Sequence, residues 1–123
     1  MDTLINAKLE DADTFLANAK EGLCKPEEDV VPYYVCDNAH KAILHLLTAY
    51  VQRNGHKLPV DPTVRELLAL CRGIDPVFDE LHLSPFYHPT DTEDIWMNLD
   101  TASDFLTMAE KTQELVLSLV PKN

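Results

Sequence analysis

The stretch VCDNAHKAILHLLTAYVQRNG, residues 35 to 55, decides the fold class of this 123-residue chain. Its apolar residues recur at intervals of three and four, which places them on one face of an α-helix. They are Val35, Ala39, Ala42, Ile43, Leu46, Leu47 and Tyr50. The spacing predicts a long amphipathic helix that begins between Val30 and Tyr33 and ends at Asn54, where Gly55 can stop it.

The same periodicity, punctuated by proline and glycine, predicts four further helices. We expect them at residues 2–22, 62–72 and 76–81, and from a capping box at residues 90–93 to the stop at Pro121. The pairs Asp61-Pro62 and Asp75-Pro76 mark the two short helices. Aspartate can accept hydrogen bonds from exposed amides, and proline fits the first helical position. Gly22 and Gly73 are the predicted stops of the first and third helices.

These lengths predict an all-α fold. Three glycines and few β-branched runs argue against an all-β protein. We expect an up-down helical bundle of three long helices, with the fourth position filled by the two short helices. A length of 123 residues corresponds to about one domain, so residues 1–123 are expected to form one helical domain.

The charge of the chain disfavours nucleic acid as a general partner. Its net charge is −11, which repels phosphate backbones. Residues 41–72 differ, because five basic residues stand against two acidic ones there, a local net charge of +3. An anionic ligand or an acidic partner would bind first at this segment, where Lys41, Arg53 and Lys57 are the candidate contacts. The simpler interpretation is a solvated face that happens to be rich in lysine and arginine.

The three cysteines and the hydropathy pattern predict a cytoplasmic protein. An odd number of cysteines without CxxC spacing is typical of a reducing compartment. No apolar run reaches the roughly 18 residues that a membrane span needs. The acidic N-terminal residues are unlike those of a secretory leader, so we expect none.

Two places could carry chemistry. Cys36 and His40 lie four residues apart on one helix face, as a pair of metal ligands would, but no matching second pair exists. A buried cysteine beside a hydrogen-bonded histidine is the preferred interpretation, and we expect no metal and no cofactor. The second place is the stretch SPFYHPTDTED, residues 84–94, where prolines stiffen a loop that presents Tyr87 and His88. It is either a ligand or partner site or the plug of the bundle end.

Aromatic residues also lie beside or off the apolar stripes. Aromatics on a second helix face are enriched at interaction hot spots, although packing against the N-terminal connection is the alternative. These residues are Tyr33, Tyr34, Tyr50 and Trp96.

Residues 36–71, together with FYHPTDTEDIWMNLDTASDFLTMAEKTQELV at 86–116, resemble the HEPN family (higher eukaryotes and prokaryotes nucleotide-binding domain). The family signature is an Ala- and Lys-bearing helix, a Gly turn, a Pro and a short Leu-rich helix. The matching positions are Ala39, Lys41, Ala42, Leu46, Gly55, Pro59, Leu67 and Leu70. His40 stands where the family favours Glu, and Asp61-Pro62-Thr63 replaces a frequent His. The resemblance implies an all-α domain that forms homodimers or works beside a minimal nucleotidyltransferase, as in toxin–antitoxin pairs.

Many HEPN domains are ribonucleases that use an Arg, four to six residues and then a His. No such pair exists here, since Arg53 precedes His56 too closely and Arg72 precedes His82 by too much. The sequence therefore favours a non-catalytic domain that acts through protein contacts, as a homodimer or with a nucleotidyltransferase partner. The alternative is a nucleotide- or RNA-binding domain, or a divergent ribonuclease. It would use the Tyr87-His88 loop and the basic segment 41–72.

Overall fold

The computed structural model describes residues 2–83 and 98–120, and all of its regular structure there is helical. The elements are α1 (Asp2–Leu23), the 3₁₀ turn η1 (Glu27–Asp29), α2 (Pro32–Arg53), α3 (Val64–Ile74), the 3₁₀ turn η2 (Pro76–Glu80) and α5 (Leu99–Leu119). The predicted all-α bundle is confirmed. Over these described ranges, no helix is both long and apolar enough to cross a membrane.

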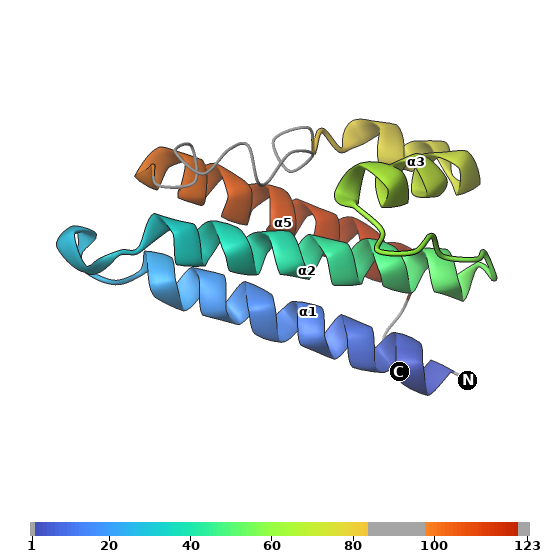
Figure 1. The fold of residues 1–123 in the computed structure, drawn as a ribbon, viewed down its shortest axis with the longest axis horizontal. Coiled ribbons are helices and arrows are strands. Elements are labelled where there is room, and N and C mark those ends of the chain that lie inside the picture. Colours follow the sequence, from blue (N-terminus) through green and yellow to red (C-terminus); the bar gives the residue numbers. More distant parts are fainter. Residues whose placement is uncertain (1, 84–97, 121–123) are drawn as a thin grey trace.

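Helix α2 is the centre of the bundle. It packs against α1, α5 and α3, and Figure 1 shows α1 and α2 as an antiparallel hairpin with α5 beside them. The short elements α3 and η2 lie over the end of α2 that leads into the connection 54–63 (Figure 1). A central helix must be apolar around much of its circumference, which is why twelve residues of α2 are buried.

The predicted stripe of α2 forms the middle of the core. Ala39, Ala42, Ile43, Leu46 and Leu47 have no exposed surface. Alanines on the facing stripes of α1 and α5 let the helix backbones approach, and larger side chains fill the space between them. The facing residues are Leu9, Ala12, Leu16 and Ala19 on α1, and Ala102, Phe105, Ala109 and Val116 on α5.

Two polar contacts tie α1 to α5 at the surface. Nε2 of Gln113 donates a hydrogen bond of 3.1 Å to Oδ1 of Asp13, and Nζ of Lys20 lies 3.0 Å from Oε2 of Glu110. Gln113 is a polar residue within the apolar stripe of α5. The hydrogen bond to Asp13 gives this interruption its physical reason.

The start and end of α3 differ from the prediction. Thr63, not Asp61, is the N-cap, because its hydroxyl accepts from the Glu66 amide while the Glu66 carboxylate accepts from the Thr63 amide. Asp61 instead has a positive φ of 47°. The helix also runs through Gly73 to Ile74, since a single glycine costs helix stability without forcing a stop.

The second short element, by contrast, starts where the sequence indicates. Oδ1 of Asp75 accepts from the Val77 amide at 3.0 Å, so this aspartate does cap η2. The guanidinium of Arg72 then donates to the carbonyl oxygens of Phe78 and Leu81, the second at 2.7 Å. Arg72 therefore holds η2 against the last turn of α3.

Two further helix boundaries differ from the prediction. The predicted capping box at residues 90–93 lies outside the described residues and stays a prediction, whereas the described helix α5 begins at Leu99. There the Asn98 side chain accepts from the amides of Asp100 and Thr101. Helix α1, which was expected to end at about Gly22, ends one residue later at Leu23. A side chain of α2 lies against Gly22, as described below.

Candidate functional site

The predicted anion contacts are spread along α2. Lys41 is exposed near the middle of the helix, where its Nζ lies 2.9 Å from Oδ2 of Asp37 and 5.8 Å from the centroid of the Phe15 ring. Arg53 is the last residue of α2, and Lys57 is exposed in the connection that follows. At 1.5 Å per residue, Lys41 and Arg53 are roughly 18 Å apart along the axis. The fold does not bring these two residues into one site.

Tyr87 and His88 lie outside the described residues, so their predicted site stays a prediction. Arg72, another base of the segment 41–72, is directed at backbone carbonyls and lies 3.6 Å from Asp79. Two of the five basic residues of this segment, Lys41 and Arg72, are therefore engaged in local contacts.

Cys36 and His40 lie on the buried side of α2. Burial raises the pKa of the Cys36 thiol to about 12, which disfavours the thiolate that binds metals. Burial also lowers the pKa of His40 below 6.5, with the charge of Asp37 opposing this shift and that of Lys41 adding to it. In the part of the chain that the structure describes, no group of three or more His, Cys, Asp or Glu side chains could hold a metal ion.

The four aromatic residues singled out in the sequence separate into different classes. Tyr50 is only 5% exposed, and its ring packs against Phe78 with the centroids 4.7 Å apart. Its predicted place on an interaction face is therefore wrong, because η2 covers it. Tyr33 and Tyr34 are exposed at the start of α2. Trp96 lies outside the described residues.

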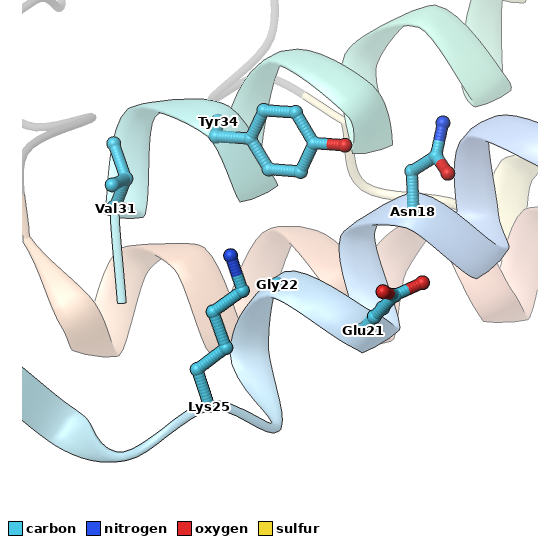
Figure 2. A pocket seen from close by; sticks show the side chains of 6 residues that line it. All are labelled: Asn18, Glu21, Gly22, Lys25, Val31 and Tyr34. Carbon is cyan, nitrogen blue, oxygen red and sulfur yellow. The ribbon is translucent and has the colours of Figure 1, made fainter. Parts of the chain in front are cut away.

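Tyr34 borders a groove between the end of α1 and the beginning of α2, which we call the hairpin groove. Its volume is about 350 Å³. Its lining residues are Asn18, Glu21, Gly22, Lys25, Val31 and Tyr34. Figure 2 shows the Tyr34 ring beside α1, with its hydroxyl directed toward Asn18, while Lys25 reaches up from the connection.

The hairpin groove has a fixed backbone. A Cβ atom on Gly22 would meet Cδ2 of the Tyr34 ring at 3.1 Å and Cγ2 of Val35 at 3.3 Å, so glycine permits this close packing. Behind the ring, Nδ2 of Asn38 donates to the Tyr34 carbonyl at 2.8 Å, and Nδ2 of Asn18 donates to Oδ1 of Asn38 at 3.5 Å. The site is thus preformed by contacts within and between the two helices.

The groove combines apolar surface with two opposite charges. Val31 is 58% exposed and Tyr34, three residues later in the first turn of α2, is 47% exposed, which is high for large side chains with apolar surface. Glu21 and Lys25 form no ion pair with any residue between 2 and 83 or between 98 and 120. Such a surface is suited to binding another protein surface.

Sequence reasoning missed most of the groove. Asn18, Glu21 and Lys25 belong to ordinary polar positions of α1 and its connection, and only the tertiary structure places them beside Tyr34. One signal could have indicated the site. Val31 is an apolar residue directly before Pro32, in a connection that is otherwise largely charged.

Comparison with known proteins adds no relationship: no family model, no curated protein and no solved structure matches this chain.

Proposed function

We propose that this chain is a non-catalytic, HEPN-like helical domain that acts through protein contacts and forms a homodimer through the hairpin groove. The observation that carries the proposal is the exposed pair Val31 and Tyr34 beside a preformed groove. Apolar and aromatic surface of this kind, next to a concave site, is what interface hot spots are made of. The missing Arg–His spacing in the sequence supports the non-catalytic part of the proposal.

A second copy of the chain is the occupant because the groove is electrostatically self-complementary. It carries one carboxylate, Glu21, and one ammonium, Lys25, and neither is paired within the described part of the monomer. A two-fold axis brings the same patch of each copy face to face. Lys25 of one copy then faces Glu21 of the partner subunit, while the Val31 and Tyr34 side chains exclude water around the two ion pairs.

The nucleotidyltransferase partner and the toxin–antitoxin role rest on the HEPN resemblance alone. In this proposal the homodimer presents its remaining surface to such a partner. Co-expression of the chain with a minimal nucleotidyltransferase, followed by co-purification, tests this extension separately from the dimer.

Light scattering after size-exclusion chromatography tests the homodimer. We expect a mass of twice 13.9 kDa at high concentration, and dissociation at lower concentration in Tyr34→Ala and Val31→Ser. Leu4→Ser is the matched control, since Leu4 is 74% exposed but does not line the groove. A monomeric wild type, or equal dimerisation in all variants, would overturn the proposal.

Charge exchange sharpens the test. Glu21→Lys and Lys25→Glu should each weaken the dimer, because each puts two like charges face to face across the axis. The double variant restores opposite charges and should recover the dimer. An RNA-cleavage assay on the same samples completes the test, since turnover that co-purifies with the protein would contradict a non-catalytic role.

A further inference from the structure

A second cavity lies where α1, α2 and the connection 54–63 meet, and we call it the His45 cavity. Its lining residues are Lys8, Leu44, His45, Thr48, Asp61 and Pro62, and its volume is about 310 Å³. The connection runs back along α2 before α3 begins (Figure 1). Asp61 and Pro62 of this connection line the cavity together with residues of α2. This volume is at the lower end of small-molecule sites, about 300–1,000 Å³. The cavity therefore suits a ligand of small-metabolite size.

Thr48 supplies a hydroxyl to the lining of this cavity. It is 8% exposed, and its hydroxyl makes no hydrogen bond to any residue that the structure describes. Some helical hydroxyls of this protein bond to a carbonyl of their own helix, as those of Thr14, Thr107, Thr112 and Ser118 do. The Thr48 hydroxyl makes no such bond and lines the cavity, so it is available to a ligand.

The hydrogen bond that His45 makes defines which of its ring nitrogens carries the proton. Its Nδ1 lies 2.9 Å from the Lys41 carbonyl oxygen, and a carbonyl can only accept, so Nδ1 carries the proton. In the neutral ring, Nε2 is then a hydrogen-bond acceptor. The Phe15 ring, with its centroid 5.2 Å away, packs against the imidazole and limits its rotation.

The two charged groups of the cavity make no ion pair within the described part of the chain. Lys8 on α1 and Asp61 in the connection form no ion pair with each other or with any other residue of the described ranges. The cavity thus offers an ammonium and a hydroxyl to an anionic group, and a carboxylate and an imidazole nitrogen to a donor. Leu44 and Pro62 supply apolar surface between these polar groups.

We propose that the His45 cavity binds a small zwitterion of the free α-amino-acid class. Lys8 and Thr48 bind its carboxylate, Asp61 and Nε2 of His45 bind its ammonium group, and Leu44 and Pro62 contact an apolar side chain. Such a molecule carries one anionic and one cationic group, which complement the ammonium of Lys8 and the carboxylate of Asp61 in the lining. The proposal is independent of the homodimer, because none of these residues lines the hairpin groove.

Calorimetric titration with free alanine, valine, leucine, methionine and phenylalanine tests the proposal. We expect saturable binding of at least one of them. Two derivatives of that amino acid test the two charged groups: the N-acetyl form lacks the ammonium, and the amide lacks the carboxylate. Each should bind at least about tenfold more weakly, which corresponds to 1.4 kcal/mol. No binding by any of the five would overturn the proposal, and so would equal binding of the N-acetyl form, which would indicate a simple anion site.

Variants locate the binding in the His45 cavity. Thr48→Val keeps the shape of the side chain and removes its hydroxyl, and Asp61→Asn removes the charge; each should weaken binding by about tenfold, or 1.4 kcal/mol. Thr14→Val and Asp29→Asn are matched controls on exposed positions outside the cavity and should leave binding unchanged. Lys8→Met adds a surface variant that leaves the core intact. Unchanged affinity in Thr48→Val, Asp61→Asn and Lys8→Met together would overturn the assignment.

Discussion

The ring of Tyr34 lies so close to Gly22 that a methyl group on this glycine would meet Cδ2 of the ring at 3.1 Å. Such a contact is too short for two carbon atoms at rest. Gly22 lies in the last turn of α1, where it lets an exposed aromatic side chain of α2 lie against the helix. The shape of the hairpin groove depends on this pair.

We expect Gly22→Ala to gain less stability than a helical glycine-to-alanine change normally gives. Alanine favours a helix by about 0.5–1 kcal/mol over glycine, but here its methyl group must displace the Tyr34 ring. When Gly22→Ala is combined with Tyr34→Ala, the ring is absent, so the glycine-to-alanine change should give its normal gain in the free energy of unfolding. Urea unfolding of the two single variants and the double variant measures this coupling.

Gly73 is the matched control for that experiment. It lies in α3, and a Cβ atom there would have nothing within 4 Å. Gly73→Ala should therefore raise the free energy of unfolding by about 0.5–1 kcal/mol. Equal effects of the two glycine substitutions on the free energy of unfolding would show that the Tyr34 ring does not oppose a side chain at position 22.

Tyr50 and Tyr34 should differ sharply in their effect on stability. Tyr50 packs against the fully buried Phe78, so Tyr50→Ala leaves a cavity and should cost about 3 kcal/mol or more. Tyr34→Ala removes a side chain that is nearly half exposed and should cost less than about 1 kcal/mol. Thermal or urea unfolding distinguishes them, and a larger cost for Tyr34→Ala would contradict the burial described here.

The three thiols should react in two separate stages. Cys24 is exposed, whereas Cys36 and Cys71 are buried with pKa values raised to about 12 by that burial. Because the thiolate is the reactive form, a disulfide reagent should titrate one thiol in the native protein and three in denaturant. Cys24→Ser should remove the fast stage entirely. A second fast thiol in the native state would be inconsistent with this core.

His40 should make the fold sensitive to mild acid. Its pKa is lowered from 6.5 by burial, so the unfolded chain takes up a proton at a higher pH than the folded protein does. The free energy of unfolding is then unaffected by this group above 6.5 and falls as the pH drops below it, toward the folded pKa. Urea unfolding at about pH 7.5 and pH 5.5 covers this window, where few carboxyl groups titrate.

His40→Gln should flatten that pH dependence. His82→Gln is the control, because His82 is exposed. An unchanged slope in His40→Gln would mean that other groups cause the acid sensitivity.

The cap of α3 gives two substitutions with different expected results. Thr63→Ala breaks the capping box with Glu66 and should lower the free energy of unfolding by about 1 kcal/mol. Asp61→Gly should not lower it, because φ at Asp61 is +47°, a region that glycine adopts without strain. If Asp61 were the cap, as its place before Pro62 suggests, the two results would be reversed.

Sequence periodicity predicted the long helices and their buried faces because the 3.6-residue repeat is a local property of the chain. The stripe of α2 is buried as expected, and Asp75 caps the helical turn that it was expected to cap. Helix boundaries were less predictable where two neighbouring residues could each act as the cap. At the start of α3 the cap is Thr63 rather than Asp61, because Thr63 and Glu66 form a reciprocal pair of hydrogen bonds.

The sequence by itself determined which faces are apolar, and hence that the described chain folds as a helical bundle. Only the tertiary structure decided what becomes of the side chains between those faces. Tyr50 is buried because Phe78 of η2 packs against its ring. Tyr34 lies against α1 because Gly22 has no side chain there. Lys8 and Asp61 line the same cavity because the connection after α2 turns back along that helix. These relations join residues far apart in the chain, and no local pattern of hydropathy records which helix will lie beside which.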